Sequence, residues 1–336
     1  MHITDALTQL NLDSSLEDFE KLLRESVAVD DDFLSEVSRH LIDAGGKRIR
    51  PILAIASAAA GGSEITREVL LAGIAVELVH LASLYHDDVM DDASQRRNVE
   101  SVNFRWGNLV AIVAGDYLLA KAAGIAARLG QEIAELLANT LADLCAGQIL
   151  EVQTSFLVSR SDDSYFEAIS GKTASLMATA CRIGALAADL DRNHIEVVTN
   201  IGRSLGMVFQ IRDDILDLVA SAEILGKMPA QDLLEGIYTL PVIETLKTPY
   251  KVDLEPLLTR NMDQASLDKA GKIILSSGGI AKAWQTAQKF ALESRVSAAE
   301  LESPIAGELG SMAQFLLDET YGIVRPYLEA KEKPNI

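Results

Sequence analysis

The sequence predicts an all-α fold built as one domain, and three observations lead to this prediction. Apolar residues recur with helical spacing along nearly the whole chain, as Phe33, Val37 and Leu41 do at every fourth position. Alternating strand-like runs bounded by turn residues are missing. No internal repeat or linker divides the 336 residues, of which 49% are hydrophobic, so residues 1–336 are expected to share one core.

The first helices are predicted from their ends as well as from their apolar faces. Residues 12–28 form an amphipathic pattern, and an aspartate among residues 30–32 is suited to cap the helix that follows. Gly45-Gly46 is expected to end that second helix, because glycine tolerates a left-handed C-cap. Pro51 then suits the first turn of a helix that runs to Ala60.

The same reasoning extends to the rest of the chain. A long helix capped by Ser63 or Thr66 is expected to end near Asp92, and a polar loop to cover residues 93–107. Further helices are expected over residues 108–128, 132–155, 163–188 and 194–219. After an ordered loop over 221–241, short amphipathic helices fill the last third, and residues 1–12 and 331–336 are expected to be frayed.

Charge excludes some functions and favours a location. The net charge of −19 opposes nonspecific binding to nucleic acid, which needs a basic surface. The N-terminus lacks a basic-then-apolar signal pattern, and charges or glycines interrupt the longest apolar runs. A soluble cytoplasmic protein without a transmembrane segment is expected.

Two acidic clusters carry the main chemical signal. Asp87, Asp88 and Asp91 share one helix face, since positions i, i+1 and i+4 lie within about 100° of arc. A second cluster repeats this spacing with Asp213, Asp214 and Asp217. Gathered carboxylates repel one another, and hard oxygen ligands without cysteine or paired histidine suit Mg²⁺. One such run is most often a solvated helix end, but both clusters emerge from strongly apolar helices and therefore predict a shared interior cavity.

Lone basic residues accompany the acids. Lys47, Arg48 and Arg50 precede or open a helix, at the end where the helix dipole disfavours cations. A phosphate would relieve that conflict, although an exposed basic turn would explain it equally well. Further cations lie beside glycine, proline or an acidic cluster, namely Arg96, Arg97, Lys172 and Lys227. A diphosphate is the ligand that reconciles acids, Mg²⁺ and lone cations in an apolar cavity.

These motifs resemble those of the trans-isoprenyl diphosphate synthase (polyprenyl synthetase) family. They occur in the same order as in that family and extend over most of the chain. The matching segments are residues 45–51, 77–80, 86–92 with Arg96-Arg97, 115–119, 172–173, 209–217, 225–227, Asp232 and 239–241. The resemblance implies an all-α homodimer of helical bundles, each around a deep central cavity. It also implies head-to-tail condensation of isopentenyl diphosphate with an allylic diphosphate, assisted by two or three Mg²⁺ ions.

The resemblance assigns roles residue by residue. It implies Mg²⁺ ligands on one wall at Asp87, Asp88 and Asp91, and on the other at Asp213, with Asp214 and Asp217 in support. It implies contacts to isopentenyl diphosphate from Lys47, Arg50, His80 and Arg97. It implies contacts to the allylic diphosphate from Arg96, Lys172, Thr173, Gln210 and Lys227. Lys172 and the acids Asp87, Asp88, Asp91, Asp213 and Asp214 would be the catalytic residues.

Product length and three departures from the family pattern complete this interpretation. Ala82 and Ser83 lie one turn before Asp87, where bulky aromatics are typical of short-product enzymes, so a product of C20 or longer is expected. A side chain from another helix would be an alternative floor of the cavity. Asn98 and Ala230 stand where glycine is common, and Ile237 stands where many relatives carry lysine.

Other functions explain less of the sequence. An HD-type phosphohydrolase would need a histidine cluster, which the spacing of the five histidines does not offer. A terpene cyclase would leave the basic segment 45–51 without a purpose, and a short-chain C15 synthase would need a blocked cavity. A non-catalytic subunit of a heteromeric synthase, or a helical scaffold, would not need intact acids in both clusters.

Overall fold

The computed structural model describes residues 13–220 and 229–329, and it confirms the predicted all-α class. The N-terminal half contains α2 (Asp13–Val27), α3 (Asp32–Asp43), α4 (Ile49–Ala60), α5 (Arg67–Met90), α6 (Val102–Trp106), α7 (Asn108–Leu129) and α8 (Gln131–Thr154). The C-terminal half contains α9 (Asp162–Ile169), the π-helix η1 (Ser170–Ala174), α10 (Ser175–Ala187), α11 (Arg192–Val219), α13 (Gln231–Glu235), α14 (Leu240–Leu246), α15 (Lys251–Leu254), the 3-10 helix η2 (Glu255–Leu257), α16 (Gln264–Ser276), α17 (Gly279–Ala298), α18 (Pro304–Val324) and the 3-10 helix η3 (Arg325–Tyr327).

The helix ends agree with the capping signals in the sequence. Asp31 caps α3, where its carboxylate accepts a 2.7 Å hydrogen bond from the Leu34 amide. Thr66 caps α5 in the same way through the Val69 amide. Gly45, with a φ of +83°, follows the C-cap of α3 and turns the chain towards α4.

Two predicted loops contain short elements that the sequence pattern did not reveal. Residues 93–107 hold α6 and an antiparallel pair of two-residue strands, β1 (Gln95–Arg96) and β2 (Val99–Glu100). The described part of 221–241 holds α13 and the start of α14. Elements this short span too few residues to show a hydrophobic period, so the pattern read as loop.

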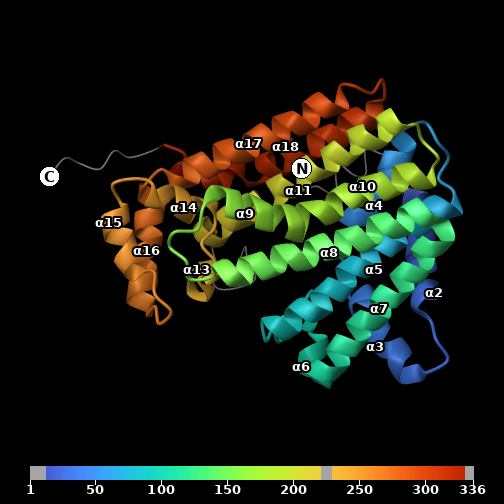
Figure 1. The fold of residues 1–336 in the computed structure, drawn as a ribbon, viewed down its shortest axis with the longest axis horizontal. Coiled ribbons are helices and arrows are strands. Elements are labelled where there is room, and N and C mark those ends of the chain that lie inside the picture. The colour runs from blue at the N-terminus through green and yellow to red at the C-terminus, as the bar shows by residue number, and fades with distance from the viewer. Residues whose placement is uncertain (1–12, 221–228, 330–336) are drawn as a thin grey trace.

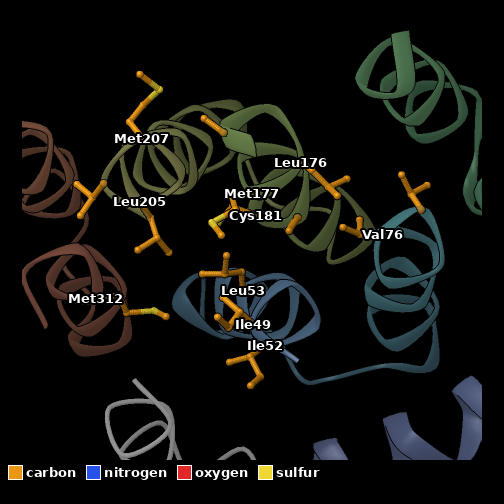
Figure 2. Close-up of a cluster of buried hydrophobic side chains, with 14 of the residues drawn as sticks. Ile49, Ile52, Leu53, Val76, Leu176, Met177, Cys181, Leu205, Met207 and Met312 are labelled. Carbon is orange, nitrogen blue, oxygen red and sulfur yellow. The ribbon is translucent and has the colours of Figure 1, made fainter. Parts of the chain in front are cut away.

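The core lies where α4, α5, α10, α11 and α18 meet. Figure 2 shows Leu53 of α4 facing Met177 and Cys181 of α10, with Leu205 of α11 beside them. Gly184 allows α10 to approach α4 closely, because a Cβ there would lie 2.0 Å from the Ala54 carbonyl oxygen. Close contact of this kind holds the long helices, and therefore their ends, in one fixed arrangement.

Three helices in the described ranges are long and apolar enough to cross a membrane, so the expectation that apolar runs stop short of this length is wrong. In α5, 72% of the most apolar stretch is buried inside the protein, compared with 39% in α7 and 22% in α8. The apolar residues of α5 therefore build the core. Those of α7 and α8 remain at the surface, with Leu109, Val113, Ile149 and Val152 exposed.

Candidate active site

A cavity of about 840 Å³ is lined by residues from the end of α5, from α8, from η1 and from α11. η1 packs against both α8 and α11, and α5 packs against α10, which brings these segments together (Figure 1). The predicted site residues in its lining are Asp91, Arg96, Arg97, Lys172, Gln210 and Asp214. Both predicted walls therefore contribute to one cavity.

Asp91 lines the cavity at the end of α5, and Asp87 lies one helical turn before it, outside the lining. Burial raises the pKa of Asp87 to about 6, and repulsion from Asp91 adds to the shift, whereas Lys172 opposes it. Burial raises the pKa of Asp91 as well, again against the attraction of Lys172. The two carboxylates are held at a cost to their charged forms, which a cation would relieve.

Lys172 reaches this cavity from the π-helix η1, which interrupts the run from α9 into α10. Its Nζ lies 2.5 Å from a Glu151 carboxylate oxygen on α8. Burial alone would lower the pKa of Lys172, but Glu151, Asp87 and Asp91 raise it overall. A single π-helical turn is a frequent feature of functional sites, and here it brings an ammonium group near acids of α8 and α5.

Asp88 is paired with Arg96, a residue of the cavity lining. Its side chain is fully buried and one oxygen accepts hydrogen bonds from Arg96, at 2.7 Å from Nε and 2.6 Å from Nη2. The Asn103 side chain also donates to the Asp88 backbone carbonyl. Asp88 is absent from the cavity lining. The Asp88 carboxylate anchors the loop after α5 through Arg96, and its role as a Mg²⁺ ligand stays a prediction.

Asp214 forms the inner face of the α11 wall. Its two oxygens accept hydrogen bonds from the Tyr165 hydroxyl at 2.6 Å and from Gln210 Nε2 at 2.8 Å. Thr173 in turn donates to Gln210 Oε1 at 2.8 Å. Burial raises the pKa of Asp214 to about 7, although the two hydrogen bonds lower it. This chain of side chains links η1, α9 and α11 at the cavity surface.

The two other acids of the second cluster lie outside the cavity lining. Asp213 forms an ion pair with Arg212, whose Nη1 lies 3.0 Å from the carboxylate, and is the most exposed acid of the cluster at 42% of its side chain. Asp217 is buried and accepts a 3.3 Å hydrogen bond from the Asp232 amide. Asp217 thereby ties α13 to α11, while Asp213 remains accessible.

The donor chemistry fits a hard cation, although no preformed cage is present. Within residues 13–220 and 229–329, no three Asp, Glu, His or Cys side chains converge on one point as a metal site would require. Asp87 is half-buried and Asp91 is exposed, and both have raised pKa values; Mg²⁺ commonly uses only one or two carboxylates together with substrate phosphates. The site therefore fits Mg²⁺ that arrives with a diphosphate.

A cluster of arginines surrounds Glu77, which is buried in the middle of α5. Arg48, whose φ is +48°, pairs with Glu77 at 3.0 Å and with Glu20 at 2.6 Å. Arg97 donates to the carbonyls of Leu41 and Gly45, and its Nη2 lies 3.9 Å from Glu77. The close turn at Gly46 makes room for this guanidinium, since a Cβ there would lie 2.9 Å from Arg97.

Arg50 lacks a full set of partners in this cluster. Its Nε is buried without a hydrogen-bond partner. Burial lowers the pKa of Arg50 to about 10, and the nearby Arg97 lowers it further while Glu77 opposes both. The Glu77 carboxylate is shared by Arg48, Arg50 and Arg97, and Glu20 is a second carboxylate beside them. With three guanidinium groups and two carboxylates, the cluster carries excess positive charge.

The remaining predicted residues differ in burial and in their contacts. Burial lowers the pKa of His80 well below its usual range, and Arg50 and Arg97 add to this effect, so the imidazole is neutral. Lys47 is exposed at the start of the same segment. Ala82 is fully buried, and the Ser83 hydroxyl donates to the His80 carbonyl at 2.8 Å. Lys227 lies outside the described residues.

The three departures from the family pattern have clear structural correlates. Asn98 and Ala230, which stand where glycine is common, have φ values of +62° and +58°. Asparagine tolerates this left-handed conformation better than alanine does. Ile237 lines the cavity and supplies no charge there.

Sequence reasoning assigned no role to several residues that shape the site. Glu77 organises the arginine cluster, Glu151 holds Lys172, and Tyr165 holds Asp214. A charged residue inside an apolar helix was the available signal for Glu77. Nothing comparable marked Tyr165, because its role depends on which helices pack together.

Comparisons with known proteins agree with this site. The sequence model of the polyprenyl synthetase family matches residues 31–274. The chain is 37% identical to nonaprenyl diphosphate synthase of Mycobacterium tuberculosis over 279 residues, which cover 82% of this chain and 83% of that protein. It is 35% identical to heptaprenyl diphosphate synthase component 2 of Bacillus subtilis, over 76% of this chain and 74% of that protein.

A solved structure shows the same fold. It is a polyprenyl synthase from Caulobacter crescentus CB15 complexed with calcium and isoprenyl diphosphate, with a TM-score of 0.86 and 29% sequence identity. The similarity covers 94% of this chain and 97% of that chain. Together with the matched family model, these similarities show that the chain belongs to the polyprenyl synthetase family of trans-prenyltransferases.

Proposed function

We propose that the chain condenses isopentenyl diphosphate head-to-tail with an allylic diphosphate in the cavity between α5 and α11, and releases a trans-polyprenyl diphosphate of C20 or longer. The observation that carries this proposal is the arrangement of charge around one 840 Å³ cavity. Two acidic helices and Lys172 meet on one side, and an arginine cluster with excess positive charge lies beside them. Two diphosphates fit this arrangement: one would bind through Mg²⁺ to the acidic side, and the other would bind directly to the arginine cluster.

The arginine cluster is the proposed site for isopentenyl diphosphate. Arg50 and Arg97 would donate to its phosphoryl oxygens, with Lys47 at the rim. The buried Nε of Arg50, which has no partner, supports this assignment. His80 would act as a neutral donor, because an imidazolium among these arginines is strongly disfavoured.

The acidic side is the proposed site for the allylic diphosphate. Asp87, Asp91 and the accessible Asp213 would hold the Mg²⁺ ions that come with it, two or three in number, and Lys172 and Arg96 would bind its free oxygens. When bound, Mg²⁺ offsets the negative charge that develops on the departing diphosphate. Arg96 keeps Asp88 as its permanent partner, so only its remaining N–H groups are available to the substrate.

In the reaction, the protein positions the two substrates, stabilises the charges that develop and excludes water. The allylic C–O bond ionises, the isopentenyl double bond attacks the allylic carbon, and a proton passes to the released diphosphate. Thr173 and Gln210 are already oriented by their mutual hydrogen bond, so their dipoles need no reorganisation as positive charge develops. The few apolar residues of the lining, among them Ile169 and Ile237, would limit the access of water to the cation.

One experiment tests the reaction and its product together. The purified chain is incubated with Mg²⁺, labelled isopentenyl diphosphate and a C5, C10 or C15 allylic primer, and the products are sized. We expect consumption of isopentenyl diphosphate and products of C20 or longer. A terpene cyclase would consume the primer without isopentenyl diphosphate, and a short-chain synthase would stop at C15.

The small residues Ala82 and Ser83 support the long product, since neither narrows the space one turn before Asp87. We expect Ala82→Phe to shorten the main product by at least one C5 unit, because an aromatic ring would fill volume along the growing chain. The measurement is the product distribution from a C15 primer. An unchanged distribution in a folded variant would assign the floor of the cavity to another helix.

A homodimer is proposed from the surface of α7 and α8. These adjacent helices expose the apolar side chains of Leu109, Val113, Ile149 and Val152. A second copy of the chain would bury these side chains and leave the polar residues around them in water, whereas a bilayer would bury both. The Bacillus subtilis relative is named as one component of its synthase, which makes a heteromer the alternative. Dimer mass and activity of the purified chain alone would support the homodimer, while activity that requires a second protein would contradict it.

A further inference from the structure

Arg160, in the segment between α8 and α9, is a buried cation with few partners. Its side chain is 5% exposed. Nη1 donates to the Tyr238 backbone carbonyl at 3.1 Å, and the guanidinium carbon lies 5.6 Å from the centre of the Tyr165 ring. Nε and Nη2 are buried without any hydrogen-bond partner. Arginine carries five N–H donors, and leaving several of them buried and unsatisfied is costly unless a ligand uses them.

The position of Arg160 indicates where such a ligand would lie. Arg160 lines the same cavity as Lys172, Asp214, Ile237 and Thr239. Glu151 and Asp214 attract its charge at longer range, but its hydrogen bond goes to a neutral carbonyl. A buried guanidinium that faces a cavity already supplied with Lys172 is suited to an anion with several oxygens.

The neighbouring Ile237 gives this position a further meaning. Ile237 lines the cavity and brings no charge to its wall. Arg160 donates to the carbonyl of the next residue, Tyr238, so its guanidinium lies on the same part of the wall. A cation reaches this place from the α8–α9 segment instead of from the α13–α14 segment.

We propose that Arg160 is a substrate-binding residue of this chain, which donates through Nε and Nη2 to phosphoryl oxygens of the allylic diphosphate and supplies the cation that Ile237 does not. This inference rests on the proposed function for the identity of the anion. A planar fork of two N–H groups matches two phosphoryl oxygens, which a lysine at position 237 would contact only as a point charge.

The test compares Arg160→Gln, Arg160→Lys and the double variant Arg160→Gln with Ile237→Lys. We expect Arg160→Gln to raise KM for the allylic diphosphate by about 10- to 100-fold, the range for a lost hydrogen bond to a charged group, with KM for isopentenyl diphosphate within about twofold. Arg160→Lys should lose less. Introducing lysine at position 237 should recover most of the loss, which a merely structural role of Arg160 would not allow.

Controls distinguish a failure of the Arg160 proposal from a failure of the proposed function. Arg182→Gln removes a guanidinium that pairs with Glu196 at 2.7 Å on α11, and it should leave both KM values unchanged. Thermal unfolding shows whether each variant is folded. An equal rise of both KM values without recovery by Ile237→Lys, or no rise in any folded variant, would overturn the role of Arg160. If the unmodified chain made no prenyl product, the proposed function would fail, and weaker binding of Mg²⁺-inorganic diphosphate to Arg160→Gln would still test the anion contact.

Discussion

The ends of α5 and α11 carry aspartates at the same spacing, yet the two walls use their middle acid in opposite ways. On α5, Asp88 lies outside the cavity lining and is paired with Arg96. On α11, Asp214 turns into the cavity and is held by Tyr165 and Gln210. Burial raises the pKa of both carboxyl groups, but a guanidinium opposes this shift at Asp88, whereas Asp214 has only neutral donors and a pKa of about 7. Equal spacing in sequence therefore does not mean equal roles.

The largest effect is expected from removing one of the proposed Mg²⁺-binding acids on either wall. Asp87→Ala and Asp213→Ala should each lower kcat by about 10²- to 10³-fold, because each removes charge that the transition state needs. Steady-state turnover with saturating Mg²⁺ measures this. Asp318→Ala, which removes an exposed acid on α18, is the control and should be unaffected. Near-normal turnover for either wall variant would refute the two-wall arrangement.

Substitutions of the two middle acids, Asp88 and Asp214, should differ in how much they destabilise the protein. Asp88→Asn leaves the Arg96 guanidinium without its anion and should cost about 2 kcal/mol, less than a fully buried pair because Arg96 is partly exposed. Asp214→Asn keeps a similar shape and neutral partners, so it should cost about 1 kcal/mol. Urea unfolding compares the two variants. If Asp214→Asn were the more destabilising change, the anchor role of Asp88 would be wrong.

The raised pKa values predict how stability changes with pH. Asp87 and Asp214 have pKa values of about 6 and about 7 in the folded protein, against an ordinary 3.8. They bind protons more tightly when folded, so their contribution to stability is full below pH 3.8 and is lost as pH rises through 6 and 7. Melting temperatures between pH 4 and pH 8 should show this loss, after allowance for other groups.

Variants assign the two parts of that pH profile. Asp87→Asn should flatten the part near pH 6, and Asp214→Asn the part near pH 7. Mg²⁺ should raise the melting temperature more at high pH than at low pH, since protons and metal compete for the same carboxylates. A profile that neither substitution alters would contradict these shifts.

The smallest effect concerns the two loops behind the walls. Ala230→Gly should stabilise the protein by about 1 kcal/mol, because alanine pays for its left-handed backbone at a φ of +58°. Asn98→Gly, at a φ of +62°, should change stability by less than about 0.5 kcal/mol, since asparagine tolerates this conformation. Thermal unfolding distinguishes them. If both substitutions raised the stability equally, backbone strain at position 230 would not be the cause of the gain there.

The local signals in the chain were enough to predict much of this molecule. Helical periodicity and caps such as Asp31 and Thr66 act over a few neighbouring residues, so the long helices follow from the sequence. The repeated aspartates and the lone cations also indicated a diphosphate chemistry before any geometry was known.

Only the tertiary structure decided which of these residues share an environment. Asp88 differs from Asp214 because the loop after α5 returns Arg96 to one, while α9 brings Tyr165 to the other. Glu77 and Arg160 gain their roles from helices and segments far away in the chain, which no local pattern reports. The sequence determined the elements and the chemical groups, because these depend on neighbours in the chain. Packing decided burial, partners and pKa values, because these depend on neighbours in space.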